Sequence, residues 1–86
     1  MKVVFYGSVL QHTNGHKEYS PDTCTDLGSL FELLGNEYDQ NLKELLISGS
    51  SFLVIVNGRG ASTTGGLETK LQHGDVVEIL PFIEAG

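Results

Sequence analysis

The hydrophobic period of this chain changes from strand-like to helix-like and back again, and this order limits the folds it can adopt. Residues 2–10 are rich in β-branched and aromatic side chains, which predicts a strand from Lys2 to Leu10. Asn14-Gly15 is a turn signal, so a short second strand is expected over 16–20. Alternation assigns Val3, Phe5 and Val9 to one face of the first strand and Val4, Tyr6 and Leu10 to the other.

The helical period begins near residue 26. Leucine and phenylalanine side chains then recur at i, i+3, i+4 and i+7, at Leu27, Leu30, Phe31 and Leu34. Thr25 or Asp26 can cap the start of this helix, and Gly35-Asn36 weakens its end. A second short helical stretch is indicated by Leu42, Leu45 and Leu46.

Strand-like runs return in the second half of the chain. Residues 52–56 form a continuous apolar run that is typical of a fully buried strand. Asn57-Gly58 predicts a turn, residues 60–66 a loop, and residues 67–71 a brief element. A last strand is expected over 76–80, with Pro81 ending its pairing.

This order of elements predicts an α+β chain with one main helix on one face of a mixed sheet of four to five strands. The first and last strands would pair in parallel at the centre, through right-handed connections. That arrangement is the ubiquitin-like β-grasp fold. We expect residues 1–80 to form this domain and residues 81–86 to form a flexible C-terminal tail.

Composition narrows the choice of partners and compartment. The chain has 86 residues, 5 basic and 11 acidic side chains, and a formal net charge of −6. This charge argues against nucleic acid and anionic membranes, and it favours partners with basic surfaces. The single cysteine, Cys24, excludes an internal disulfide and suits a reducing compartment. Because there is no apolar segment long enough to cross a bilayer and no signal-peptide pattern, a cytoplasmic location is expected.

Side chains that usually carry chemistry do not form a convincing site in the sequence. His12 and His16 have a zinc-like spacing but flank a predicted turn, so no metal site is expected. Cys24 has no neighbouring basic residue to activate it, which favours a packing role. The glycine-rich stretch over 58–66 lacks the lysine of a phosphate-binding loop. Nothing in the sequence places the carboxylate pairs in a pocket, whether Glu78 with Glu84 or Asp75 with Glu68.

The end of the chain offers a different kind of reactive group. The last residues are Pro81, Phe82, Ile83, Glu84, Ala85 and Gly86. A terminal glycine carboxylate can be activated as an acyl-adenylate and attacked by a sulfur or amine nucleophile. Glycine has no Cβ, so such a tail can thread a narrow channel and approach a nucleotide closely. The alternative is that the terminal residues are merely small and carry no function.

Three stretches together resemble the MoaD/ThiS family of ubiquitin-like sulfur carriers. These stretches are Val54-Ile55-Val56-Asn57-Gly58, the run from Leu71 through Gly74-Asp75 to Leu80-Pro81, and the short tail that ends in Gly86. The opening strand and the helix near Leu27 also fall where that family has them. By its length the chain is most similar to the small subunit of molybdopterin synthase.

The resemblance implies a mechanism in which the chain is a carrier subunit and not an enzyme. An E1-like adenylating enzyme would convert the Gly86 carboxylate into an adenylate, and sulfur transfer would give a thiocarboxylate. A large catalytic subunit, or another sulfur-accepting enzyme, would then take the sulfur for molybdopterin synthesis. The adenylate and the thiocarboxylate are transient forms, and no bound cofactor is expected.

Other outcomes are left open by the resemblance. The sulfur acceptor could instead belong to thiamine, cysteine or tRNA-thiolation chemistry, or Gly86 could be joined to lysine as in a protein modifier. Ala85 stands where the family usually has glycine, which we expect to disfavour lysine conjugation more than sulfur transfer. A non-conjugating interaction module is the further alternative. By position, the family's partner-binding apolar patch matches Tyr6 and Leu80, and Phe82 could extend it. Parallel pairing of the first and last strands would put Tyr6 and Leu80 side by side on the face away from the helix.

Overall fold

The computed structural model describes residues 1–21, 24–49 and 51–82. The N-terminal half contains strand β1 (Lys2–Phe5), 3-10 helix η1 (Gly7–His12), strand β2 (Glu18–Tyr19), helix α1 (Leu27–Glu37) and helix α2 (Gln40–Ser48). The C-terminal half contains strands β3 (Phe52–Val56) and β4 (Arg59–Gly60), 3-10 helices η2 (Ala61–Thr63) and η3 (Gly66–Glu68), and strand β5 (Val76–Pro81).

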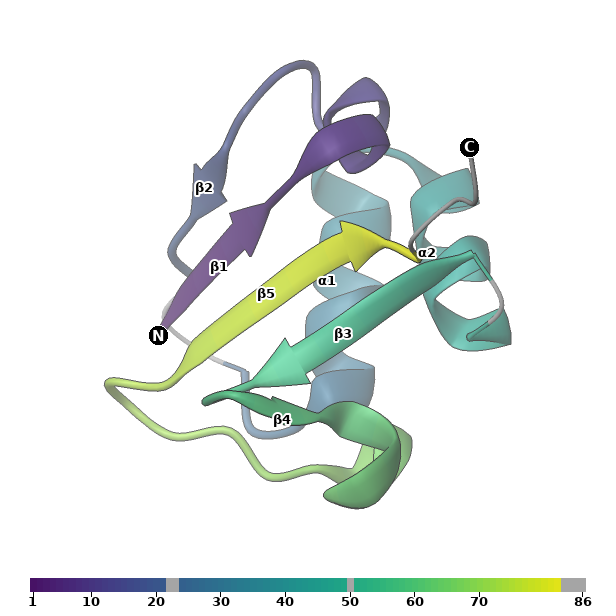
Figure 1. Cartoon of the computed structure of the whole chain (residues 1–86). Coiled ribbons are helices and arrows are strands. Elements are labelled where there is room, and N and C mark those ends of the chain that lie inside the picture. The colour runs from purple at the N-terminus through teal and green to yellow at the C-terminus, as the bar shows by residue number, and fades with distance from the viewer. Residues whose placement is uncertain (22–23, 50, 83–86) are drawn as a thin grey trace.

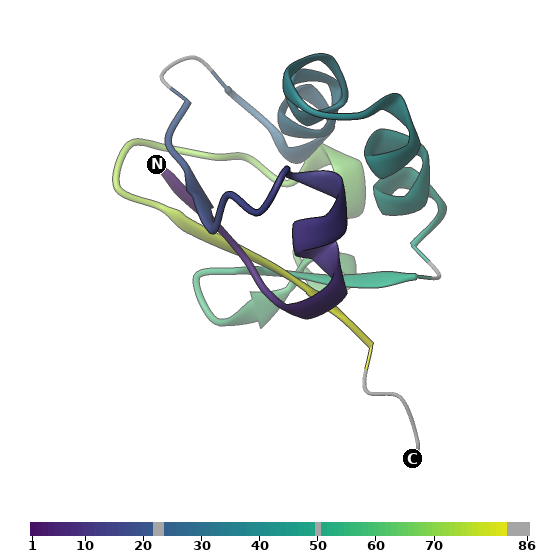
Figure 2. The ribbon, with the colours of Figure 1, turned by 90° about the horizontal axis from the view of Figure 1, so that it is seen from above.

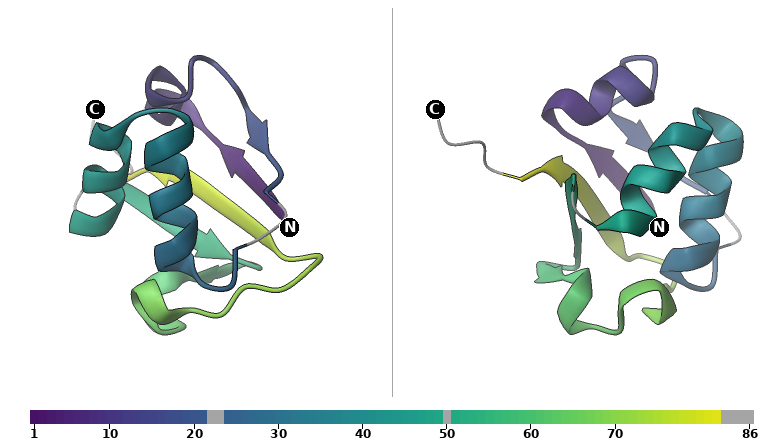
Figure 3. Two further views of the ribbon diagram at one scale, coloured as in Figure 1. Left: turned by 180° about the vertical axis from the view of Figure 1, so that it is seen from behind. Right: turned by 90° about the vertical axis from the view of Figure 1, so that its right-hand side faces the viewer.

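The described residues build a five-stranded mixed sheet in the order β2-β1-β5-β3-β4 (Figure 1). β1 and β5 pair in parallel at the centre, and each of the other neighbouring pairs is antiparallel. Both α1 and α2 lie on one side of the sheet (Figure 2; Figure 3, left). The predicted β-grasp fold is confirmed, and α2, the second predicted helical stretch, packs on the same face as α1.

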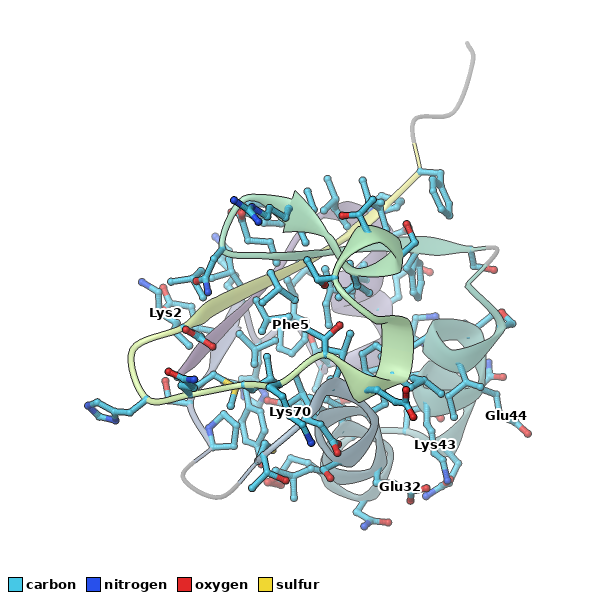
Figure 4. The ribbon with its side chains drawn as sticks, turned by 90° about the horizontal axis from the view of Figure 1, so that it is seen from below. Lys2, Phe5, Glu32, Lys43, Glu44 and Lys70 are labelled. Atoms are coloured by element: carbon cyan, nitrogen blue, oxygen red, sulfur yellow. The ribbon has the colours of Figure 1, made fainter. Side chains whose placement is uncertain are left out.

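The core lies between the sheet and the two α-helices. The side chains of Val3, Phe5, Val77 and Ile79 point toward the helices and are at most 2% exposed. Phe5 lies in the interior of the molecule (Figure 4). Helix α1 contributes the leucines and the phenylalanine that its period predicted, which are Leu27, Leu30, Phe31 and Leu34. The apolar period of the sequence therefore located the helical side of the core.

Both α-helices begin at an aspartate cap. The Asp26 side chain accepts a hydrogen bond of 2.8 Å from the Ser29 N–H, as predicted for α1. Asp39 accepts from the Asn41 N–H at the start of α2, at 3.1 Å. An ion pair of 2.7 Å between Glu32 and Lys43 joins the exposed sides of α1 and α2 (Figure 4).

The predicted first strand is too long. β1 ends at Phe5, and the chain turns into η1 at Gly7, whose φ of +58° is incompatible with an extended strand. Val9 is nevertheless fully buried, because η1 packs it against the core. Leu10 lies in η1 and packs against the same core, so its predicted place on the opposite face was wrong.

Two other predicted boundaries also differ from the structure. α1 continues through Gly35 to Glu37, because Gly35 serves close packing rather than ending the helix. A Cβ at Gly35 would lie 2.9 Å from the Lys43 Cβ of α2. The predicted loop at 60–66 contains the end of β4, all of η2 and the start of η3.

The predicted end of β5 was also one residue short. Pro81 is the last residue of β5 and lies opposite Phe52 in β3. In an antiparallel ladder, residue pairs that exchange backbone hydrogen bonds alternate with pairs that do not. The Asn57 N–H donates to the Val76 carbonyl, so Asn57 and Val76 form a hydrogen-bonded pair, and so does every second pair along β3 and β5 from that point. Phe52 and Pro81 form one of the pairs that exchange no backbone hydrogen bond. The missing N–H of proline therefore costs this ladder nothing.

The Asn57 and Asp75 side chains link the β3–β4 turn to the start of β5. Asn57 has a positive φ of 51°, and its side-chain oxygen accepts from the Val76 N–H at 2.9 Å. Its amide nitrogen donates to Asp75 at 3.0 Å, and Asp75 also accepts from the Gln72 N–H at 2.8 Å. These two motif residues therefore have a structural role. Together they fix where β5 begins.

We predict that Leu34→Ala lowers the free energy of unfolding by about 2–5 kcal/mol, because it removes a fully buried side chain and leaves a cavity. Urea denaturation measures this change. Ile47→Ala is the matched control, since Ile47 is 48% exposed and its truncation should change stability by only about 0.5 kcal/mol or less. Equal losses in the two variants would contradict the described core.

We also predict a pH-dependent contribution from Asp75. The hydrogen bond from Asn57, followed by that from the Gln72 N–H, lowers the pKa of the Asp75 carboxyl. Because the folded pKa lies below the unfolded one, this stabilisation is present above the unfolded pKa and is lost as pH falls through the folded pKa. The stability difference between the wild type and Asp75→Asn should therefore shrink on acidification. Urea titrations of both proteins between pH 7 and about pH 3 measure it, and parallel curves would contradict the prediction.

Candidate functional site

The described part of the chain ends just after the central strand of the sheet. β5 lies between β1 and β3, and Phe82 follows directly after its last residue, Pro81. The Phe82 side chain is 42% exposed. The other predicted tail residues, Ile83, Glu84, Ala85 and Gly86, lie outside the described residues. Their roles stay predictions.

The sheet surface that faces away from the helices is called the open face here. In the parallel register Phe5 lies opposite Ile79, and the Tyr6 N–H donates to the Ile79 carbonyl at 3.0 Å. Tyr6 is therefore beside Leu80, as the sequence predicted. The open face comprises Val4, Tyr6, Leu53, Ile55, Glu78 and Leu80, of which Tyr6 is 42% exposed and the other five are half-buried.

Leu53 and Ile55 are open-face residues that sequence reasoning missed. They lie opposite Leu80 and Glu78 respectively and are half-buried. The run at 52–56 is apolar at every position, so periodicity alone predicted a strand buried on both faces. No sequence signal distinguishes them, because strand alternation assigns their face only once Phe52, Val54 and Val56 are known to face the core.

A hydrogen-bonded acid lies in the middle of this largely apolar face. The Tyr6 hydroxyl donates to Glu78 Oε2 at 2.7 Å. This hydrogen bond, together with some burial and the negative charge of Glu78, raises the pKa of the Tyr6 phenol. The carboxylate has further lone pairs available, so it can accept from a cationic donor on a partner.

Pro81, where the tail begins, is held in place by a contact with the chain just after β1. A Cβ at Gly7 would lie only 3.1 Å from Pro81 Cγ, so Pro81 packs directly over the glycine backbone at the start of η1. This contact holds the last residue of β5 against the first turn after β1. Phe82 therefore starts from a defined place on the body.

The two N-terminal histidines are held by different partners. His12 Nδ1 lies 3.0 Å from Asp39 Oδ2 at the start of α2, whereas the His16 ring packs 5.8 Å from that of Tyr38. Across residues 1–21, 24–49 and 51–82, no group of three or more histidine, cysteine, aspartate or glutamate side chains could hold a metal ion. In the same residues no helix is long and apolar enough to cross a membrane.

Cys24 lies far from the start of the tail. It lines a small hollow together with Met1, Leu71, Gln72 and His73, near the beginning of β1 and β5. Burial, together with the charge of Asp26, raises the pKa of the Cys24 thiol. Of the carboxylates considered in the sequence, Glu84 lies outside the described residues, and the other three lie in different parts of the fold. Asp75 stabilises a turn, Glu68 lies in η3 and Glu78 lies on the open face.

Comparison with known proteins identifies the family. Residues 3–86 match the ThiS family. The chain belongs to this family of ubiquitin-like sulfur carriers. A comparison of this ThiS-family chain with curated protein sequences gives no significant match.

Solved structures resemble this ThiS-family chain over almost its whole length. CysO of Mycobacterium tuberculosis is 28% identical with a TM-score of 0.81, and the match covers 95% of this chain and 98% of CysO. Urm1 of Trypanosoma brucei is 26% identical with a TM-score of 0.74, covering 99% and 84%. The complex of subunits 1 and 2 of the Helicobacter pylori molybdopterin-converting factor contains a chain that is 25% identical with a TM-score of 0.66, covering 99% and 96%.

We predict that Glu78→Gln lowers the pKa of the Tyr6 phenol toward its ordinary value. The variant removes the negative charge that favours the protonated phenol and weakens the acceptor of its hydrogen bond. Selective labelling of tyrosine and NMR titration measure this pKa. Tyr19 and Tyr38 serve as internal references, because burial is the main cause that raises the pKa of each. A Tyr6 titration that is unchanged in the variant would show that the described hydrogen bond does not form in solution.

Proposed function

We propose that this protein is a sulfur carrier whose Gly86 carboxylate is activated and converted to a thiocarboxylate. In the first step a carboxylate oxygen attacks the α-phosphorus of ATP on an E1-like adenylating enzyme, and pyrophosphate leaves. A sulfur donor at the oxidation level of hydrosulfide then attacks the acyl carbon, and AMP leaves. The partner that accepts sulfur breaks the carbon–sulfur bond, and water restores the carboxylate.

The observation that carries the proposal is the position of β5 in a chain of this family. Its last residue, Pro81, ends the central strand beside exposed Phe82, four residues before Gly86 in the sequence. The family match extends through residue 86. The tail can therefore enter a partner's active site while the body stays outside.

The body contributes recognition in this proposal. The open face carries Tyr6 and Leu80 next to the start of the tail, and Phe82 extends the apolar surface along it. We propose that these side chains bind the adenylating enzyme and the sulfur-accepting enzyme, which supply the catalytic groups. The single cysteine fits a reducing compartment, so the proposal places the carrier in the cytoplasm.

The proposed sulfur acceptor is the precursor of molybdopterin, with the large synthase subunit as the second partner. The likeness to a chain in the complex of subunits 1 and 2 of the molybdopterin-converting factor supports this acceptor. A carrier for another sulfur pathway is the second candidate, because the TM-score to CysO is 0.81 against 0.66 for the converting-factor subunit.

We predict that incubation with ATP, a sulfide source and a cognate adenylating enzyme adds the mass expected for replacing one oxygen by sulfur. Intact-mass spectrometry measures this, and fragmentation should place the change at Gly86. Deletion of Gly86 should abolish it, whereas Asn41→Ala, an exposed change on α2, should leave it intact. The thiocarboxylate form should then lose its sulfur on addition of the molybdopterin-synthase large subunit with its precursor.

Each other result has a defined meaning. Discharge only with an acceptor of another sulfur pathway would support the second candidate and reject molybdopterin. Isolation from cells of Gly86 joined to lysine would support a protein modifier. If the wild type gains no mass with any adenylating enzyme tested, and deletion of Ala85-Gly86 leaves its cellular role unchanged, the carrier proposal is wrong.

A further inference from the structure

An apolar groove opens at the side of the sheet, near the start of the tail, and it borders the open face at Leu53. It has a volume of about 270 Å³ and lies between α2, β3 and the 3-10 helices η2 and η3. Among the described residues, four large apolar side chains are strongly exposed, and three of these line the groove. They are Ile47 at 48%, Leu67 at 44% and Phe82 at 42%.

The chemistry of the lining favours a peptide over a small charged ligand. Among the described residues, the lining is apolar or glycine apart from Ser62, and no charged side chain lines it. Its volume is below the range of about 300–1,000 Å³ that small-molecule sites usually have. A nucleotide or phosphate would find no charged group there. One or two large apolar side chains would fill it.

The described residues leave the edge of β3 along this groove unpaired. β4 lies opposite only Ile55 and Val56, so the part of β3 from Phe52 to Val54 has no neighbouring strand on that side within the described residues. Counting from the hydrogen-bonded pair of Asn57 and Val76, Phe52 and Val54 fall in the pairs that exchange no hydrogen bond with β5. Their N–H and C=O groups therefore point away from β5. They point toward the side on which the groove lies, and both residues line it. An extended segment could therefore pair with β3 while its side chains enter the groove.

Phe82 connects this groove to the reactive end of the chain. It forms part of the groove wall and is followed by only four residues, which span at most about 14 Å when fully extended. An enzyme that holds Gly86 in its active site must therefore come close to Phe82. Its surface beside the tail channel would lie over the groove.

We propose that this groove and the Phe52–Val54 edge bind an extended apolar segment of the adenylating enzyme, as an added strand next to β3. This inference rests on the proposed function, because it identifies the partner through the Gly86 tail. Backbone pairing to β3 would give the segment its direction, and large side chains in the groove would give it affinity. The tail and the groove would then be recognised together.

The test is steady-state thiocarboxylation by the adenylating enzyme with the double variant Ile47→Ala/Leu67→Ala. Both side chains are exposed, so we expect the variant to fold. We expect its KM as carrier substrate to rise about tenfold with kcat unchanged, because uniform binding is lost and the chemistry is not. Asn41→Ala, on the same helix as Ile47 but away from the groove, should keep the wild-type KM.

Hydrogen exchange of the wild-type protein provides a second measurement that needs no variant. The Phe52 and Val54 amides should exchange more slowly in the complex with the adenylating enzyme than in the free carrier. Amides at the exposed start of α2 should be unchanged. This readout separates strand pairing from a merely apolar contact.

The remaining outcomes distinguish failure of this inference from failure of the carrier proposal. If the wild type is thiocarboxylated, but the double variant keeps the wild-type KM and the two amides are not protected, the groove inference alone is wrong. If protection rises with carrier concentration without enzyme, a second copy is the occupant and the inference is overturned. The same holds if removing residues 83–86 speeds exchange in the free protein, since the occupant is then the carrier's own tail. A wild type that is never thiocarboxylated overturns the carrier proposal itself.

Discussion

The parallel pairing of β1 with β5 is the constraint on which the rest of the structure depends. These strands come from opposite ends of the described chain, so everything between them must form a crossover that returns to the same sheet. The crossover places α1 and α2 on one face, and the four most central side chains, Val3, Phe5, Val77 and Ile79, become the centre of the core. The other face of the same two strands is left free of helices. The core and the proposed recognition surface are therefore set by one pairing.

Much of this arrangement could be predicted from the sequence, because it depends on period and on local capping. The spacing of Leu27, Leu30, Phe31 and Leu34 predicted helix α1, and the capping residue Asp26 predicted where the helix begins. The boundaries that failed depend on contacts between distant segments. Gly35 looked like a helix end until α2 was seen packed against it, and Pro81 looked like a strand end because the alternation of hydrogen bonds in β5 is invisible in a linear sequence.

The sequence predicted some parts of the candidate site and missed others. Tyr6 and Leu80 could be placed side by side because register follows from parallel pairing and alternation. The groove could not be predicted, since its walls come from α2, η3 and the residue after β5, which are remote in sequence. Nor could the Tyr6–Glu78 hydrogen bond, because it depends on side-chain reach across the sheet. Sequence patterns identify which face of a strand or helix a residue occupies. Grooves and side-chain hydrogen bonds depend on contacts between segments that are distant in the sequence.

The place of Cys24 has a consequence for selectivity among sulfur atoms. The acyl-adenylate is an electrophilic acyl group, and a thiolate on the same molecule would compete with the sulfur donor to attack it. Cys24 is half-buried near the beginning of β5, whereas the tail leaves from the end of that strand. Burial also keeps its sulfur in the less nucleophilic thiol form. The fold thus separates its own sulfur from the one it is proposed to deliver, in both distance and protonation state.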